Sequence, residues 1–173
     1  MPVQAQTRAT PVTPSSLERF NTAPADEAAH TLLTCLNSHH WAHRLTSHRP
    51  YPDLPSLLAA ADEAAYDLSP DDLTEALAAE DLPPLPEDTY AAAHTALNAA
   101  YAAYEARFGH VFVICAEELS AHEALDHVLA GIRSRLTNDP DEERLVAADE
   151  LRRLARTRLI DLLRGAGDCA TSH

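Results

Sequence analysis

Helix start signals recur along this chain, and they constrain its fold more than any other feature of the sequence. Ser69 and Pro70 are followed by two aspartates, which combines a capping side chain, a proline at the first helical position and carboxylates near the positive end of the helix dipole. Ser120 and Glu123 have the spacing of a capping box, and Pro140 follows an Asn-Asp pair. Between these signals, apolar residues recur every three or four positions, as in helices that bury one face. The sequence therefore predicts an all-α, single-domain helical bundle of about seven helices.

Two internal stretches are predicted to be non-helical. Residues 80–88 contain three prolines, which a regular helix does not accommodate in its interior. Residues 111–115 are a largely β-branched run that is too short for a helix, so we predict an extended segment that crosses the core. Gly109 stands just before this run and is expected to end a long helix over residues 89–108.

The two ends of the chain are predicted to lie outside the bundle. Residues 1–15 are polar and rich in proline and threonine, and we expect them to form a flexible leader before a helical domain over residues 16–164. The last helix, which Pro140 opens, is expected to turn Leu145 inward and to end at Gly165 and Gly167. This leaves residues 165–173 as a flexible tail.

The charge balance argues against several classes of partner. The net charge is −14, so phosphate backbones and anionic lipid surfaces repel the chain. No apolar run approaches the roughly 20 residues that span a bilayer, and the N-terminus lacks the layout of a signal peptide. Three cysteines without paired spacing fit reduced thiols. We therefore predict a cytoplasmic protein that binds neither nucleic acid nor membranes.

One pair of histidines has a spacing that metal sites use. His39 and His43 lie four residues apart, which places them on the same face of a helix. No cysteine or carboxylate completes a coherent ligand set around them, so we predict a solvated surface or a dimer face there, and no metal site.

Six pieces of the sequence occur in an order that is typical of one enzyme family. The pieces are Phe20-Asn21, Cys35 with Trp41 and Arg49-Pro50-Tyr51, Leu97-Asn98-x-x-Tyr101, the run over 108–115, Arg135-Leu136-x-Asn138-Asp139-Pro140 with Glu143 after it, and Arg158-Leu159. Any one piece is weak evidence, whereas six in the same order argue against a chance match. Over about residues 17–163, the chain resembles the 2-oxo-4-hydroxy-4-carboxy-5-ureidoimidazoline (OHCU) decarboxylases.

The resemblance implies an all-helical bundle, usually a homodimer, that acts on a small molecule without a metal or an organic cofactor. Members of the family remove a carboxylate from a ureido-imidazoline in urate breakdown and yield (S)-allantoin. The electrons left behind delocalise into the ring. The protein therefore has to orient the carboxylate and to place an acid/base group beside the reacting carbon.

The resemblance also assigns one wall of a substrate site. Phe112, Val113 and Ile114 match the segment that lines the family's ligand, and Arg158 matches the arginine that binds the substrate. A guanidinium in that place makes physical sense, because it binds a carboxylate or ureido oxygen through two parallel hydrogen bonds. The alternative is a solvated arginine on an arginine-rich helix. These four residues are the predicted substrate-binding residues.

The sequence departs from the family pattern where the catalytic motif lies. The position of the family's His-Pro pair holds Glu80 and Asp81, the stretch that follows is shorter than in typical members, and it contains no Ser-x-x-Glu-Gln motif. A buried carboxylate can replace histidine as an acid/base group, although a solvated acidic loop is the simpler alternative. His94 is the only histidine on the next predicted helix and is a second candidate, against a structural role. Glu80, Asp81 and His94 are therefore the predicted catalytic residues.

Three functions fit these observations. The first is a repurposed, cofactor-free, lyase-type enzyme that decarboxylates, cyclises or isomerises a small carboxylate-bearing metabolite. It requires a pocket at Arg158 that contains His94 or a carboxylate with a perturbed pKa. The second is a catalytically inactive binding or regulatory protein, for which a collapsed or solvent-open site is expected. The third is an OHCU decarboxylase that gives (S)-allantoin with displaced catalytic residues.

Overall fold

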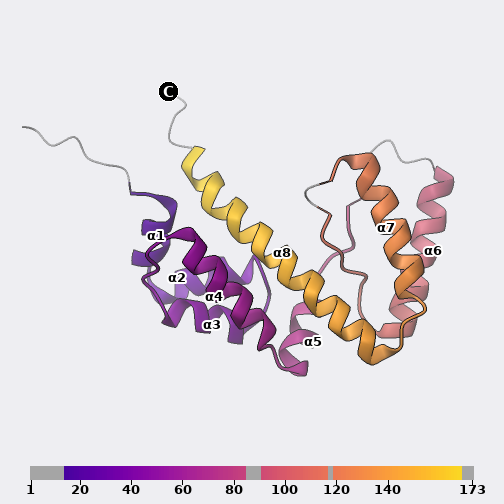
Figure 1. Cartoon of the computed structure of the whole chain (residues 1–173), viewed down its shortest axis with the longest axis horizontal. Helices are drawn as coiled ribbons and strands as arrows, with labels where there is room; N and C mark the ends of the chain where they lie inside the picture. The colour runs from indigo at the N-terminus through magenta and orange to yellow at the C-terminus, as the bar shows by residue number, and fades with distance from the viewer. Residues whose placement is uncertain (1–13, 85–90, 117–118, 169–173) are drawn as a thin grey trace, which may run out of the picture.

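The computed structural model of the chain describes residues 14–84, 91–116 and 119–168, which form eight helices and no strand (Figure 1). The helices are α1 (Ser16–Thr22), α2 (Ala25–Leu33), α3 (His39–Ser47), α4 (Leu54–Tyr66), α5 (Pro70–Ala78), α6 (Ala91–Phe108), α7 (Ala121–Arg135) and α8 (Pro140–Asp168). Over this part of the chain, the predicted all-α fold is confirmed. None of these helices combines the length and the apolar character that crossing a membrane requires.

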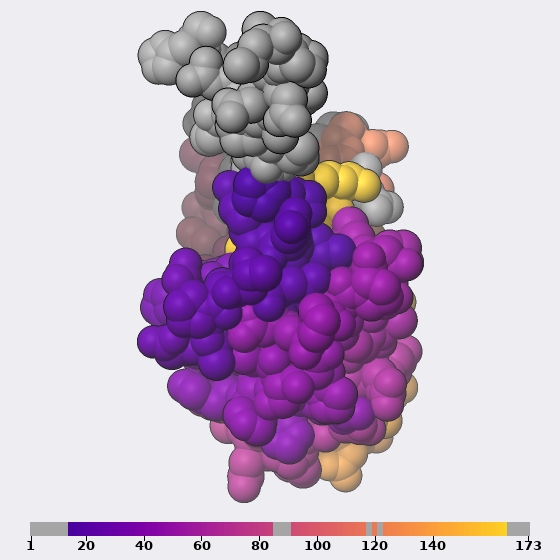
Figure 2. Space-filling view, turned by 90° about the vertical axis from the view of Figure 1, so that its left-hand side faces the viewer, coloured from indigo at the N-terminus to yellow at the C-terminus, as the bar shows by residue number. Residues whose placement is uncertain are grey.

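Helix α8 runs diagonally through the middle of the molecule, between two groups of helices (Figure 1). On one side, α1 and α4 pack directly against α8, and α3 lies against both α2 and α4. On the other side, α6 and α7 pack against each other. The face of the molecule that the N-terminal helices cover is shown in Figure 2. The C-terminal helix is therefore the element that connects the two halves.

The buried apolar side chains form two clusters, and residues 111–115 contribute to both. The larger cluster draws on α1 to α5 and α8, and the smaller one draws on α6 and α7. Val113 packs in the larger cluster, whereas Phe112 and Ile114 pack in the smaller one. Successive side chains of an extended backbone point to opposite sides, which explains this division. The predicted extended segment is thus confirmed, and it lies between the two clusters.

The local start signals act as the sequence predicts. Ser69 and Asp72 form a capping box at α5, and Ser120 and Glu123 form another at α7. Each serine side chain accepts a hydrogen bond from a backbone N–H that has no partner within the helix. Gly109 directly follows α6 with a φ of 79°, a left-handed conformation that favours glycine.

Two predictions for the last helix are wrong, and a third falls largely outside the described residues. Helix α8 continues through Gly165 and Gly167 to Asp168, because glycine inside a helix costs only about 1 kcal/mol and does not by itself end it. Leu145 is 74% exposed instead of buried, since it lies on the outer side of the first turns of α8. The predicted leader and tail lie mostly in residues 1–13 and 169–173, which are not described.

A buried ionic network ties α6, α7 and α8 to the extended segment. Glu143, which is 0% exposed, accepts hydrogen bonds from Arg135 Nε at 2.8 Å and Nη2 at 2.6 Å. It also accepts from the Tyr104 hydroxyl and from Asn138 Nδ2. The other terminal nitrogen of Arg135, Nη1, donates to the carbonyl of Val113 at 2.6 Å. Every strong polar atom of this network has a partner, which is the condition under which a buried charge is tolerated.

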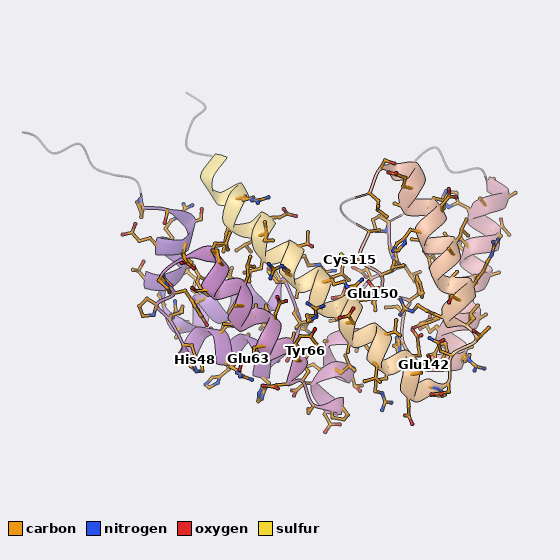
Figure 3. All side chains as sticks on the ribbon, viewed as in Figure 1. His48, Glu63, Tyr66, Cys115, Glu142 and Glu150 are labelled. Carbon is orange, nitrogen blue, oxygen red and sulfur yellow. The ribbon has the colours of Figure 1, made fainter. Side chains whose placement is uncertain are left out.

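We expect the substitution Glu143→Gln to lower the free energy of unfolding by about 3–5 kcal/mol, because it leaves the buried Arg135 without its counter-charge. Urea denaturation followed by circular dichroism measures this loss. The matched control is Glu142→Gln, which removes the same charge from an exposed side chain in the same turn of α8 (Figure 3). The control should lose less than about 1 kcal/mol. Equal losses in the two variants would contradict the assignment.

Candidate functional site

A cavity of about 440 Å³ lies where the two halves of the molecule meet at α8. It is lined by the end of α2 and the residues after it, the segment that follows α5, the extended segment, α7 and α8. Leu33, Val113, Ile114 and Leu154 contribute apolar walls. The polar or charged lining side chains are Thr34, Asn37, Glu80, Asp81 and Arg158. A mostly apolar space with a few convergent polar groups is typical of a small-molecule site.

The main polar contact in this cavity is a two-point ion pair between Arg158 and Glu80. Arg158 Nη1 donates to Glu80 Oε1, and Nη2 donates to Oε2, each at 2.8 Å. Nη1 also donates to the carbonyl of Cys35 at 3.1 Å. The side chain of Glu80 is only 7% exposed, whereas that of Arg158 is 32% exposed. The guanidinium is therefore fixed in orientation, and part of it remains open to solvent.

Local sequence explains how Glu80 comes to lie there. Helix α5 ends at Ala78, and the N–H of Glu80 still bonds to the carbonyl of Leu77 at 3.3 Å, in the manner of a final tight turn. Pro83 and Pro84 follow, and proline lacks the N–H that a continuing helix needs. The chain consequently leaves the helix axis just after Glu80, which directs this carboxylate toward α8.

The wall formed by the extended segment is held from behind. Arg135 bonds to the carbonyl of Val113, and the N–H of Cys115 donates to Glu150 Oε2 on α8 at 2.8 Å. Figure 3 labels Cys115 and Glu150. Gly131 of α7 also lies against this wall, because a Cβ added there would stand 2.9 Å from Ile114 Cδ1. Close packing and hydrogen bonds thus fix a stretch of chain that no regular secondary structure supports.

The structure brings together five of the predicted site residues and separates two. Five of them line this cavity, namely Glu80, Asp81, Val113, Ile114 and Arg158. Of these five, Asp81 is exposed, at the rim of the cavity. Phe112 is 0% exposed and is not among the cavity-lining residues, because its ring packs on the aromatic side chains of α6. His94 is in the first turn of α6, which packs on α7, and it does not line this cavity either. The chemical roles of these residues stay predictions.

Tyr101 marks the side of the extended segment that faces away from the cavity. Its ring lies 6.0 Å from that of Phe112, centroid to centroid. Burial raises the pKa of Tyr101 to about 12, because ionisation of a phenol is unfavourable away from water. The rings of Tyr101 and Phe112 therefore pack against each other, and neither residue lines the cavity.

Sequence reasoning did not identify two polar contributors to the cavity, Thr34 and Asn37. They follow α2 in an irregular stretch, and no motif or periodicity distinguishes them. Pairing of Glu80 with Arg158 was also not predictable, since 78 positions separate the two residues. Cys35 was noted only as part of the resemblance, and here its carbonyl supports the arginine.

The histidine pair on α3 makes a contact of another kind. His39 Nδ1 lies 2.6 Å from Glu75 Oε1 of α5, and the His39 side chain is largely exposed whereas that of Glu75 is half-buried. Within residues 14–84, 91–116 and 119–168, no three His, Cys, Asp or Glu side chains are grouped so as to hold a metal ion.

Comparison with known proteins gives one family and a consistent fold. The family model described as OHCU decarboxylase matches residues 21–160. A 2-oxo-4-hydroxy-4-carboxy-5-ureidoimidazoline decarboxylase of Amia calva is 34% identical over 77 residues, which cover 44% of this chain and 39% of that protein. The match therefore spans well under half of that curated relative.

Two solved structures share the fold at 21% identity. The crystal structure of an (S)-allantoin synthase superposes with a TM-score of 0.69, over 86% of this chain and 54% of that one. The crystal structure of an OHCU decarboxylase in the presence of (S)-allantoin superposes with a TM-score of 0.66, over 82% of this chain and 99% of that one. At this level of identity, the two matches support the fold and do not extend to chemistry.

The burial of Cys35, whose carbonyl supports Arg158, leads to a measurable prediction for its thiol. Burial raises the pKa of Cys35, and a hydrogen bond to Thr34 and the charge of Arg158 lower it by less. Because only the thiolate is nucleophilic, alkylation of Cys35 by iodoacetamide at pH 8 should be at least about tenfold slower in the folded protein than in urea. Peptide mass spectrometry measures both rates, with the half-buried Cys115 as an internal comparison. Equal rates for Cys35 in the two states would show that the thiol is accessible.

Proposed function

The chain belongs to the OHCU decarboxylase family, and we propose that it is a cofactor-independent, decarboxylase-like lyase whose substrate is a small carboxylate-bearing metabolite. The observation that carries this proposal is the Glu80–Arg158 pair in the wall of a partly enclosed cavity. It supplies a cation for the carboxylate that is to be lost and a second ionisable group beside it. The substitution of the family's His-Pro pair by Glu80 and Asp81 favours a substrate related to OHCU, but altered at the reacting end.

Arg158 is proposed to orient the substrate. The planar guanidinium presents parallel N–H donors, which match the two oxygens of a carboxylate or the carbonyl oxygen of a ureido group. Its position on α8 is held by buried neighbours on the same helix, Leu154, Ala155 and Leu159. A group fixed in this way loses little conformational freedom when a substrate binds, which favours productive alignment.

Glu80 is proposed to carry the proton that the reaction needs. When the bond between the substrate carbon and its carboxylate breaks, carbon dioxide leaves and the electron pair stays on the substrate, delocalised into an adjacent carbonyl or imine system. Protonated Glu80 then donates its proton to that carbon and is reprotonated by water. The apolar walls at Val113, Ile114 and Leu154 limit the access of water to this carbon.

Assembly and location remain expectations. The family resemblance favours a homodimer, and three cysteines without paired spacing favour the reducing environment of the cytoplasm. Sedimentation equilibrium and fractionation of cells that express the tagged protein address the two points separately.

The proposed activity is tested by following carbon dioxide release, and (S)-allantoin by circular dichroism, from freshly generated OHCU and from a panel of small ureido carboxylates. The protein should accelerate release from at least one of them above the spontaneous rate. The substitution Arg158→Ala should lower kcat/KM by about a hundredfold, because hydrogen bonds to charged groups contribute about 1.5–3 kcal/mol each. Arg153→Ala is the matched control, since Arg153 lies on the same helix, 55% exposed and paired with Asp149. It should stay within about twofold of the parent, as expected for an exposed ion pair.

Two outcomes would overturn this proposal. No release above the spontaneous rate from any member of the panel, together with measurable binding of those compounds, would favour an inactive binding protein on the same fold. Equal losses in Arg158→Ala and Arg153→Ala would indicate that the helix matters for folding and that the guanidinium of Arg158 has no special role.

A further inference from the structure

The inference that follows deepens the proposed function and rests on it, since it concerns how a carboxylate enters the same cavity. We infer that a ligand carboxylate replaces Glu80 on the guanidinium of Arg158, and that Glu80 takes up one proton in the exchange. Glu80 is then both the internal competitor of the substrate and the group that its arrival converts into a neutral acid. The contacts of the pair carry the argument.

The first step is geometric. Glu80 engages Nη1 and Nη2 of Arg158 at 2.8 Å each, which is the arrangement that an incoming carboxylate would itself adopt. Nη1 is further held by the Cys35 carbonyl at 3.1 Å, so the guanidinium cannot simply turn to present another edge without losing that bond. A ligand carboxylate that seeks two-point binding on this edge therefore has to displace Glu80.

The second step concerns charge. The ionisable side chains among the described residues that line the cavity are Glu80, Asp81 and Arg158, which together carry two negative charges and one positive charge when ionised. A bound carboxylate adds a third negative charge. Like charges that share a partly buried site cannot all stay ionised, because Coulomb repulsion is strong where water is scarce. The least costly response is for one carboxylate to take up a proton.

The third step identifies which carboxylate that is. The side chain of Glu80 is 7% exposed, whereas Asp81 is exposed at the rim and stays solvated. Once separated from Arg158, Glu80 is a buried anion without its cation, which is the situation that most favours protonation. The exchange is balanced, since the ligand carboxylate gains two N–H donors and one proton moves from water to a Glu80 oxygen.

Among the described residues that line the cavity, none besides Arg158 supplies a cation for Glu80. From α8 it contacts Arg158, and the cavity-lining residues after α2 are the uncharged Thr34 and Asn37. The described cavity-lining residues of the extended segment and of α7 are apolar, namely Val113, Ile114, Ala116, Ala124 and Val128. The proton therefore has to come from solvent through the open side of the cavity.

The test uses two probes that differ only in charge. N-carbamoylglycine carries a ureido group and a carboxylate, and its amide carries the ureido group without the charge. Isothermal titration calorimetry in two buffers of different ionisation enthalpy counts the protons taken up on binding. Between about pH 6 and pH 8, where the carboxylate of the probe itself stays ionised, the anionic probe should take up about one proton and its affinity should fall about tenfold per pH unit. The amide should take up none.

The substitution Glu80→Gln removes the competing charge and keeps the shape of the side chain. At pH 8 this variant should bind the anionic probe about tenfold or more tightly than the parent, with proton uptake near zero and no gain for the amide. Its circular dichroism spectrum should match that of the parent. Glu142→Gln is the matched control, because it removes one negative charge from an exposed side chain that does not line the cavity, and it should retain the proton uptake.

Several results would overturn the inference. It fails if the parent binds the anionic probe without proton uptake, a measurement that does not depend on any variant being folded. It also fails if Glu80→Gln binds this probe no more tightly than the parent, or if neither protein binds it. Failure of the proposed function is distinguishable, because it appears as proton-coupled binding of the carboxylate without carbon dioxide release from any substrate.

Discussion

The arrangement of α6, α7 and α8 depends on one buried ion pair, between the carboxylate of Glu143 and the guanidinium of Arg135. A carboxylate with no exposure to water is tolerated only if its oxygens are satisfied, and here Arg135, Tyr104 and Asn138 satisfy them. Because these partners come from α6, α7 and the turn before α8, the need to solvate one anion brings three parts of the chain together. Arg135 also donates a hydrogen bond to the carbonyl of Val113. An ion pair outside the cavity therefore fixes the position of one cavity wall.

The parts of the fold that the sequence predicts well are those that local physics decides. Ser69 and Ser120 cap helices because the first N–H groups of any helix need acceptors within a few residues, and this requirement is visible in the sequence itself. The extended segment at 111–116 is predictable for a similar reason, since β-branched residues between helix signals disfavour a helix. By contrast, the exposure of Leu145 depends on which neighbours α8 has at its first turns, and a single sequence does not contain that information.

The candidate site also contains some residues that the sequence predicts and others that only tertiary packing determines. Position 158 could be assigned from its resemblance to a family, and Val113 and Ile114 could be placed beside it. Phe112 packs on the aromatic side chains of α6 and does not line the cavity, and its role in substrate binding stays a prediction. His94 was chosen because it lies near in sequence to the position where the family motif is expected. Nearness along a chain does not imply nearness in space, and His94 does not line the cavity. Glu80 was named as a candidate, but its partner was not, because tertiary packing joins it to Arg158.

The glycine at 131 has a consequence for how this scaffold can change. Any side chain larger than hydrogen at that position meets Ile114 Cδ1, and Ile114 also lines the cavity on its other side. A methyl group introduced at position 131 would consequently shift the Ile114 side chain and narrow the cavity without itself contacting a ligand. A substitution at Gly131, which does not line the cavity, therefore changes the width of the site. Such a change alters which substrates fit while it leaves the ionic groups of the cavity unchanged.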